Sequence, residues 1–336
     1  MKKLLFIFLF LFNIVLLASC ANTNVASSSV NGASSSSTVV DDYKLTVVAP
    51  QGAPAIALAN VALNNKNQYA FIDAETIGDQ FTVTGDEAKD IIVAPVNAGA
   101  KLFKLGFSTY RLGAVLTWGN IFIATQRTDI QSLSDLNGKE ITIFKKKSIN
   151  ASIVKYVLSQ NNITCTYKPS MDENGDYTAA QTKEKLISDE NAIVVTAEPA
   201  LTTAVNSLKQ SGKTVKSFSI QELYKNISGS DYTQAGLFIK ASTITNHKSV
   251  VDKYLDDVKA SCDLFKTDLN TAINNVIALE IPGVPKAAPV LQSALPKCNI
   301  KYVSAKDAKA DVEKTANIDL SQFGGAVPSD GFYYNK

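Results

Sequence analysis

The sequence predicts an α/β fold built on mostly parallel sheets, and three observations lead to this prediction. Short apolar runs typical of buried strands alternate with longer amphipathic stretches typical of helices. Pro, Gly and Asn gather where a strand gives way to a helix. Residues 41–336 are long enough for one bilobal unit or two modest domains. Strands that alternate with helices pair in parallel, because each helix carries the chain back across the sheet.

Each predicted strand is a short run rich in β-branched, aliphatic or aromatic residues, bounded by turn residues. The first, YKLTVVA, ends at a Pro-Gln-Gly turn, and two later strands flank Trp118-Gly119-Asn120. In chain order the predicted strands are 43–49, 69–75, 81–85, 90–94, 110–117, 121–126, 140–144, 163–170, 192–197 and 236–242.

The predicted helices follow these strands and carry their own start and stop signals. Pro54 suits the first position of a helix, where its missing N–H costs nothing, and Gly106 suits the position that ends one. In chain order the predicted helices are 55–63, 98–105, a short helix near 132–136, 151–160, 178–190, one between the turn after strand 192–197 and Gly212, and about 249–280. His247, the only histidine, stands at the start of the last helix, so we expect a loop or cap residue there.

Five loops that follow strands are the candidate ligand-binding loops. In parallel sheets, ligands bind outside the carboxyl ends of the strands, where helix N-termini offer free N–H groups. The same residues also serve ordinary turns, so each loop alone has a plain structural explanation. The five loops are APQGAP (49–54), APVNAG (94–99), TWGN (117–120), KKKSINAS (145–152) and TAEPAL (196–201).

The N-terminus predicts export and a lipid anchor. Two lysines follow Met1, and residues 4–17 are apolar except for Asn13, as in a secretory signal peptide. This run is shorter than the roughly 20 residues of a membrane span. Leu17-Ala18-Ser19-Cys20 resembles the bacterial lipobox, which implies cleavage before Cys20 and a diacylglycerol on its sulfur. The alternative is a secreted protein whose cysteine carries no lipid.

The mature chain then begins with a tether. Residues 20–41 are rich in Ser and have no hydrophobic periodicity, as in a flexible linker. We therefore divide the N-terminus into a signal peptide, 1–19, and a lipid-anchored tether, 20–41. The predicted location is the outer face of the cell membrane.

Composition excludes several classes of function. The formal net charge is +2 and no basic stripe occurs, which argues against nucleic-acid binding. A single histidine excludes histidine-based metal clusters and disfavours Ser-His-Asp or Cys-His triads. Beyond Cys20 the odd number of cysteines argues against a disulfide framework, so we expect Cys165, Cys262 and Cys298 to be small buried side chains, although one pair could form. We predict no metal, no cofactor and no enzymatic activity.

Several motifs together resemble the solute-binding lipoproteins of ABC importers, over about residues 44–334. The similar group includes binders of nitrate, sulfonates, taurine and the thiamine precursor hydroxymethylpyrimidine. The motifs are APQGAPAIALA, DIIVAPVNAGAKLFKLG, GAVLTWGNIFIAT, SLSDLNGKEITIF, AEPALTTA, YTQAGLFIKAS, LPKCNIKYVSAKDAKADVE and FGGAVPSDGFYYN.

The resemblance implies a type II periplasmic-binding-protein fold, with two α/β lobes around a ligand cleft and a two-strand hinge near IFIAT and AGLFIK. Lobe one would comprise 42–124 and 234–336, and lobe two 125–233. Ligand binding would favour closure, and a permease would recognise the closed form. The protein would be a monomer whose partners are a small-molecule ligand, the permease subunits and the membrane.

Candidate ligand contacts come from the matching loops. They are Gln51, Gly52, Ala53, Asn97, Thr117, Trp118, Gly119, Asn120, Ser148, Glu198, Tyr232 and Gln234. Trp118 could stack on a planar ligand or pack in the hinge. Glu198 could bind an amine or aminopyrimidine, or cap the next helix.

The polar and aromatic candidates favour a small planar polar ligand resembling a vitamin precursor. No arginine has a clear place in the cleft, and bidentate arginine is the usual clamp for carboxylates and sulfonates. One alternative is an anion binder of the sulfonate or nitrate type. Another is a surface adhesin or signalling lipoprotein with the same fold, because a fold does not fix a function.

Overall fold

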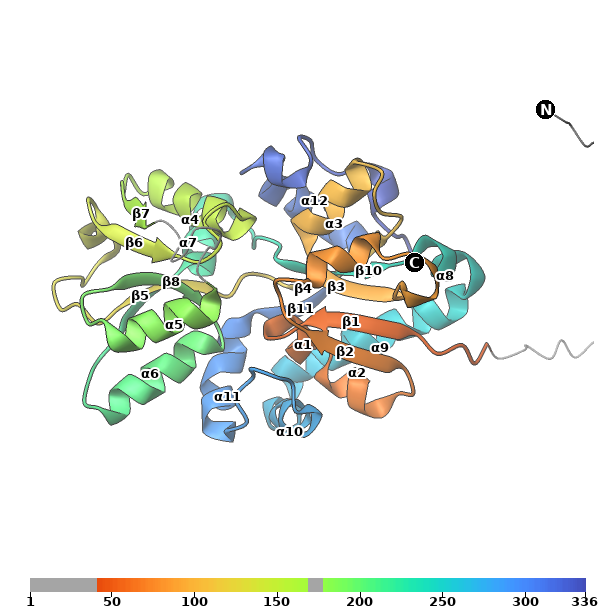
Figure 1. Ribbon diagram of the computed structural model, residues 1–336, viewed down its shortest axis with the longest axis horizontal. Helices are drawn as coiled ribbons and strands as arrows, with labels where there is room; N and C mark the ends of the chain where they lie inside the picture. The colour runs from red at the N-terminus through yellow and green to blue at the C-terminus, as the bar shows by residue number, and fades with distance from the viewer. Residues whose placement is uncertain (1–40, 169–177) are drawn as a thin grey trace, which may run out of the picture. The chain divides into compact units, whose positions relative to one another are not determined.

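The computed structural model describes residues 41–168 and 178–336. Residues Asp41–Lys336 form one compact unit (Figure 1). The predicted signal peptide, Cys20 and all but the last residue of the tether lie outside the described residues. None of the described helices has the length and apolar character that crossing a membrane requires.

Lobe one is built on a six-stranded sheet, here called sheet A, with the order β11-β4-β10-β3-β1-β2. Strands β1, β2 and β3 are parallel, whereas β10 inserts antiparallel between β3 and β4. Strand β11 adds an antiparallel edge beside β4. The strands are β1 (Thr46–Pro50), β2 (Gln68–Ile72), β3 (Ile91–Pro95), β4 (Arg111–Thr117), β10 (Ala235–Ile239) and β11 (Ile300–Ser304).

Helices cover both faces of sheet A because its central strands are apolar on both sides. Helices α1 and α9 pack on one face, and α3 and α12 on the other (Figure 1). Residues such as Val47 and Val93 bury toward the first face, and Val48 and Ile92 toward the second. The helices of this lobe are α1 (Ala53–Ala57), α2 (Ala59–Asn64), α3 (Val96–Lys104), α8 (Ala241–Asn246), α9 (Lys248–Thr267), α10 (Leu269–Leu279), α11 (Ala288–Ala294) and α12 (Ala305–Ala316).

Lobe two is built on a five-stranded sheet, sheet B, with the order β7-β6-β8-β5-β9. Strand β8 is parallel to β6 and antiparallel to β5. Its strands are β5 (Ile121–Thr125), β6 (Glu140–Ile143), β7 (Thr166–Lys168), β8 (Ile193–Ala197) and β9 (Lys216–Ser219). Its helices are α4 (Ile149–Gln160), α5 (Ala179–Ser188), α6 (Ala200–Gln210) and α7 (Ile220–Ser228).

The predicted fold class, an α/β fold with two lobes, is confirmed. The expectation of mostly parallel sheets is wrong: among the described strands four pairings are parallel and five are antiparallel, because β10 and β5 each run antiparallel between two neighbours. The chain first changes sheet at Trp118–Asn120, because β4 lies wholly in sheet A and β5 wholly in sheet B. It returns between α7 and β10, through residues 229–234. One hydrophobic cluster continues through this junction and includes Trp118 and Tyr232.

Two predicted elements are wrong. The segment 81–85 is no strand: 3-10 turns occupy Ile77–Thr82 (η1) and Gly85–Glu87 (η2). Phe81 is buried edge-on against Tyr110 and Phe238, so its apolar character reflects these two aromatic contacts and no strand face. The predicted helix 249–280 is two helices, since Asp268 ends α9 and its carboxylate accepts a hydrogen bond from the Thr271 N–H at the start of α10.

Four other 3-10 turns lie within the described residues. They are η3 (Leu133–Leu136), η4 (Leu295–Cys298), η5 (Leu320–Phe323) and η6 (Asp330–Phe332). The short helix predicted near 132–136 is therefore the turn η3, which Ser132 and Asp135 close with reciprocal hydrogen bonds.

Candidate functional site

Three of the five predicted loops meet at the junction of the two sheets because the strand ends align there. In sheet A, Ala235 at the start of β10 pairs with Pro95 at the end of β3 and with Thr117 at the end of β4. In sheet B, Ile121 at the start of β5 pairs with Ala197 at the end of β8. The structure thus brings the segments 95–97, 117–120, 198–199 and 232–234 to one region.

Asn120 is the centre of this region. Its Nδ2 donates to the Glu198 carbonyl oxygen at 2.7 Å, and its Oδ1 accepts from Gln234 Nε2 at 2.9 Å. Its own carbonyl oxygen accepts from the Glu198 N–H at 3.0 Å. Gln234 in turn accepts a backbone hydrogen bond from Val96, next to Asn97, and donates one to Thr117. A chain of hydrogen bonds therefore joins lobe one to lobe two through predicted residues.

Glu198 is fully buried, with a side chain 0% exposed. Its carboxylate accepts hydrogen bonds from the Thr202 N–H at 3.0 Å and from the Thr202 hydroxyl at 2.8 Å. The first of these bonds gives a partner to one of the free backbone N–H groups in the first turn of α6. Lys297 lies 3.7 Å away. Burial raises the pKa of the Glu198 carboxyl, while the bonds from Thr202 and the charge of Lys297 offset part of that rise. Of the two expected roles, these contacts favour helix capping.

Trp118 is also buried, with 2% of its surface exposed. Its Nε1 donates to the Lys301 carbonyl oxygen at 2.8 Å, and the Lys301 ammonium lies 4.2 Å from the ring centroid. Lys301 also pairs with Asp231 at 3.1 Å. Because a cation already covers one ring face, the structure favours packing at the junction over stacking on a ligand.

Gly119 allows the close packing of the junction. Its φ of +86° lies in the region that favours glycine. A Cβ at this position would stand 2.2 Å from Tyr232 Cζ and 2.3 Å from Gln221 Oε1. Tyr232 is fully buried, and neither its hydroxyl nor Gln221 Oε1 has a hydrogen-bond partner in the described chain. Two polar oxygen atoms beside Gly119 are therefore buried without hydrogen bonds among the described residues.

Sequence reasoning missed two residues of this region, Gln221 and Lys301. Gln221 lies on α7, and its Nε2 donates to Asp231 at 2.6 Å. Lys301 lies on the edge strand β11. No predicted element included either residue, and their types alone carry no signal of a binding site.

The first and second loops of lobe one lie at the ends of β1 and β3. Gln51 donates its N–H to the Ile72 carbonyl oxygen, Gly52 is half-buried with open space beside it, and Ala53 is buried at the start of α1. Asn97 lies in the first turn of α3, where its Oδ1 is buried and has no hydrogen-bond partner within 41–168 and 178–336. Asn97 therefore keeps an acceptor free for a partner.

Ser148 is placed apart from this network. It caps α4, and its hydroxyl oxygen accepts from the Ala151 N–H at 3.3 Å. The preceding lysines form the loop between β6 and α4, in which Lys145 pairs with Glu75 of lobe one at 3.0 Å. Lys145 and Lys146 are half-buried, and Lys147 is exposed.

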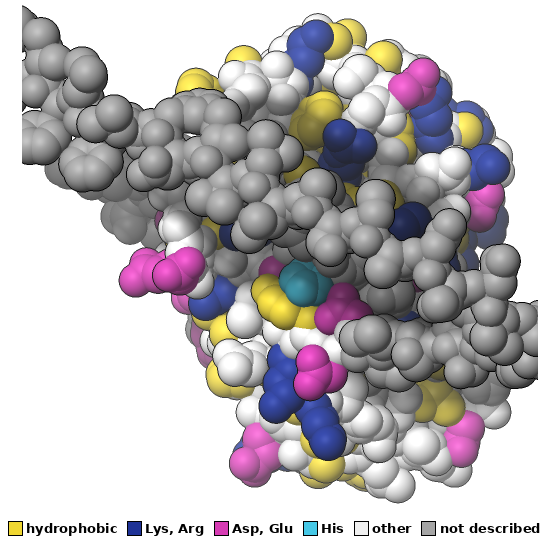
Figure 2. All heavy atoms as spheres, turned by 90° about the vertical axis from the view of Figure 1, so that its right-hand side faces the viewer, with side chains coloured by type: hydrophobic (Ala, Val, Ile, Leu, Met, Phe, Trp, Pro, Cys, Tyr) yellow, Lys and Arg dark blue, Asp and Glu magenta, His cyan; other side chains and the backbone are white. Residues whose placement is uncertain are grey.

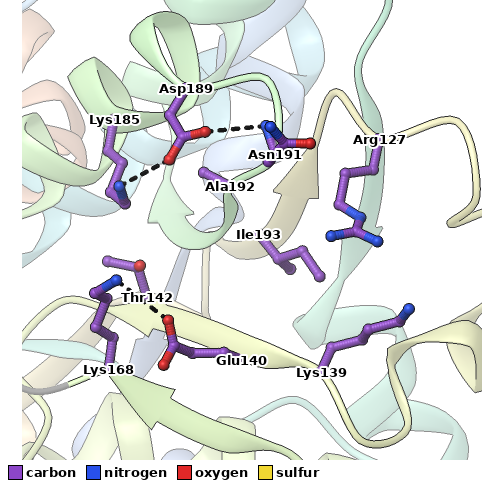
Figure 3. Close-up of a pocket in the computed structure, with 10 residues that line it drawn as sticks. All are labelled: Arg127, Lys139, Glu140, Thr142, Lys168, Lys185, Asp189, Asn191, Ala192 and Ile193. Atoms are coloured by element: carbon purple, nitrogen blue, oxygen red, sulfur yellow. Dashed lines mark hydrogen bonds and ion pairs between the residues drawn. The ribbon is translucent and has the colours of Figure 1, made fainter.

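A pocket of about 200 Å³ lies in lobe two and contains none of the predicted site residues (Figure 3). Its charges are paired: Lys168 with Glu140 at 3.2 Å, and Lys185 with Asp189 at 3.0 Å. Arg127 points between these pairs in Figure 3 but is bound to Asp129 at 2.6 Å. This pocket is a mixed-charge surface, separate from the junction.

Two further expectations concern single residue types. His247, the cyan side chain in Figure 2, lies at the residue before α9, stacks on Tyr43 and hydrogen-bonds Asp41 at 2.9 Å. It therefore has the expected cap position and makes contacts on the surface.

Cys262 and Cys298 are buried free thiols, whereas the free Cys165 is half-buried. Among residues 41–168 and 178–336, no group of three or more His, Cys, Asp or Glu could hold a metal ion.

No protein-family model matches the sequence, and no curated protein matches it. Solved structures do match. An ABC transporter from Parabacteroides distasonis matches with a TM-score of 0.71 at 18% identity, over 88% of this chain and 100% of that one. The periplasmic aliphatic sulphonate binding protein SsuA from Escherichia coli matches with a TM-score of 0.64 at 12% identity, over 87% and 92%.

The chain has the fold of these structures. A desulfurization enzyme, DszB, also matches, with a TM-score of 0.50 at 13% identity, over 83% of this chain and 92% of that one. The fold by itself therefore includes proteins of different function, and the function has to be argued from the residues at the junction.

Proposed function

We propose that this chain is an extracytoplasmic solute-binding lipoprotein that captures a small polar molecule and delivers it to an ABC importer. Lobe one would follow sheet A and lobe two sheet B, so the boundary expected between residues 124 and 125 moves back to residues 118–120, because β5 (Ile121–Thr125) lies wholly in sheet B. Cys20 would carry the lipid, and residues 20–41 would tether the protein to the membrane. Closure around the ligand would present the form that the permease recognises.

The observation that carries this proposal is the hydrogen-bonded chain from Val96 through Gln234 and Asn120 to Glu198. It joins the ends of strands from two different sheets, which is where ligands bind in α/β folds. The likeness to an ABC transporter structure over 88% of this chain supports the same conclusion.

The unused polar atoms bear on the ligand. Asn97 Oδ1 is an acceptor without a partner among the described residues, so a molecule that satisfies it has to carry an N–H or O–H group. This supports a planar polar ligand with such donors, of the vitamin-precursor kind, over a bare oxyanion. The contacts of Trp118 and Glu198 reduce the support for aromatic stacking and for an ionic bond to an amine. The likeness to SsuA supports the alternative of a sulfonate binder.

A thermal-shift screen of residues 21–336 tests the proposal. The panel holds pyrimidines, thiamine precursors, aromatic amines, riboflavin, sulfonates, nitrate and dicarboxylates. A ligand at 100 times its dissociation constant stabilises the folded chain by about 2.7 kcal/mol, a shift of several °C. Asn97→Ala should abolish most of the shift, whereas Asn64→Ala, at an exposed position of α2, should leave it unchanged.

Each outcome of the screen distinguishes between the proposed functions. A shift with planar bases supports an importer of a vitamin precursor. A shift with sulfonates or nitrate alone keeps the importer and rejects the planar ligand. No shift with any compound contradicts solute binding and favours the adhesin or signalling role. Turnover of a compound, seen by chromatography, would contradict the prediction that the protein is no enzyme.

A further inference from the structure

The loop Phe144–Ser148, here called the closure loop, connects β6 to α4 in lobe two and contacts lobe one. Lys145 Nζ lies 3.0 Å from Glu75 Oε2, and Glu75 lies between β2 and η1 of lobe one. The two side chains are 36% and 49% exposed. This ion pair spans the two lobes without including a predicted ligand contact.

Two further contacts join the same part of lobe two to η5 and the residue before it. Gln322 Nε2 donates to the Lys147 carbonyl oxygen at 3.0 Å. The Ser152 hydroxyl, on α4, donates to Asp319 Oδ2 at 2.7 Å. The pKa of the Asp319 carboxyl is lowered, because hydrogen bonds from Ser321 and Ser152 outweigh the effect of burial, which raises it. Asp319 is therefore an ionised acceptor for Ser152 near neutral pH.

The backbone of the closure loop has an unusual conformation at Lys145. Its φ is +46°, a value that non-glycine residues seldom adopt. The Lys145 carbonyl oxygen accepts from the Ser148 N–H at 2.8 Å, which closes a tight turn before α4. A strained turn that also carries an interlobe ion pair suggests a conformation kept for a functional reason.

We infer that Glu75 and Lys145 are positioning residues that set solute affinity by holding the closure loop against lobe one. This inference rests on the proposed function. A solute that binds only the closed form has an apparent affinity proportional to the closed fraction of the free protein. An exposed ion pair changes such an equilibrium by a factor of roughly two to five. The pair therefore sets affinity without touching the solute.

Single-molecule energy transfer on the ligand-free protein tests the inference. Dyes are placed on Lys66→Cys in lobe one and Gln160→Cys in lobe two, both exposed positions. The half-buried Cys165 is replaced by Ser, and the buried Cys262 and Cys298 are kept. Residues 21–336 are used, so that Cys20 is absent. The measured quantity is the ratio of closed to open molecules.

We expect Glu75→Gln and Lys145→Gln each to lower the closed-to-open ratio by a factor of two to five. The charge swap, Glu75→Lys with Lys145→Glu, should restore it. High salt should lower the ratio in the parent protein and leave both single variants unchanged. Glu140→Gln is the matched control. It removes the ion pair between Glu140 and Lys168, which is similar in length to the pair between Glu75 and Lys145 but lies within lobe two alone.

Three results would overturn the inference: an unchanged ratio in both single variants, no recovery in the charge swap, or an equal effect of Glu140→Gln. These readouts need no ligand, so they are independent of the thermal-shift screen. A silent screen with a changed ratio would reject solute binding and retain the interlobe contact. A responsive screen with an unchanged ratio would retain solute binding and reject the role of Glu75 and Lys145.

Discussion

Gly119→Ala is the substitution that most directly tests the packing of the junction. The added methyl would meet the Tyr232 ring at 2.2 Å, its hydroxyl at 2.5 Å and Gln221 Oε1 at 2.3 Å. Real Cβ atoms do not approach neighbours so closely, so both side chains would have to move. Tyr232 is 0% exposed and Gln221 is 5% exposed, which leaves neither of them open space to move into.

The cost has two parts. Placing an alanine at a φ of +86° costs about 1–2 kcal/mol. Forcing a methyl into a filled core costs about 1–3 kcal/mol more. We therefore expect Gly119→Ala to lower the free energy of unfolding by about 2–5 kcal/mol. Gly138→Ala is the matched control, because Gly138 has a similar φ of +74° and nothing within 4 Å of the added Cβ.

Urea denaturation measures both variants. Circular dichroism follows the whole chain, and the fluorescence of Trp118, the only tryptophan, follows the residue next to the substitution. The difference between the two variants isolates the packing cost. If Gly119→Ala destabilised the chain no more than Gly138→Ala, the junction would not be tightly packed and our account of it would be wrong.

Three other predictions concern groups in or near the junction. Because burial raises the folded-state pKa of Glu198 above its unfolded value, its contribution to stability is present at acid pH and is lost as pH rises through the folded pKa. The free energy of unfolding of Glu198→Gln should therefore rise relative to that of the parent between pH 4 and pH 7, as measured by urea titration. The same difference between variant and parent at both pH values would contradict a raised pKa for Glu198. Asn120→Ala removes two side-chain hydrogen bonds at a 5% exposed position and should cost about 1–3 kcal/mol, again by urea titration; a cost within error of zero would refute the bridging role. In thiol titrations of residues 21–336, Cys165 should react first because it is only half-buried, whereas Cys262 and Cys298 are buried and should react only after unfolding. Burial raises the pKa of all three thiols, which slows their reaction in the folded chain. Fewer than three reactive thiols after unfolding would reveal a disulfide.

Much of the architecture is predictable from the sequence because the central strands have clear periodicity. Strands β1, β3 and β8 are buried runs with a proline at or just after their end, and their loops fall where the apolar runs end. The edge strands are harder to predict, since β9 is half exposed and has Phe218 as its only large apolar residue. Strand β11 has the same difficulty at the edge of sheet A.

The candidate site is predictable only in outline. Loop position indicates that Asn120, Glu198 and Gln234 belong near a cleft, but their hydrogen bonds join residues far apart in the sequence. No local pattern shows that Lys301 covers the ring of Trp118, because that contact depends on how β11 pairs with β4. Local periodicity therefore predicts which loops matter, and the pairing of distant strands decides what their side chains do.

The position of β10 in sheet A has a consequence for how the chain folds while it is being made. Strands β3 and β4 are neighbours in sequence, yet β10, from residues 235–239, separates them in the sheet. A chain that emerges from its N-terminus leaves one edge of β3 and one edge of β4 unpaired until residue 239 has appeared, and the other edge of β4 unpaired until β11 follows. Such edges pair readily with other chains. The strands of sheet B lie within residues 121–219 and need nothing that follows them. Lobe two can thus pair all its strands once residue 219 has been made, while lobe one has to be kept from aggregating until β10 and β11 have followed.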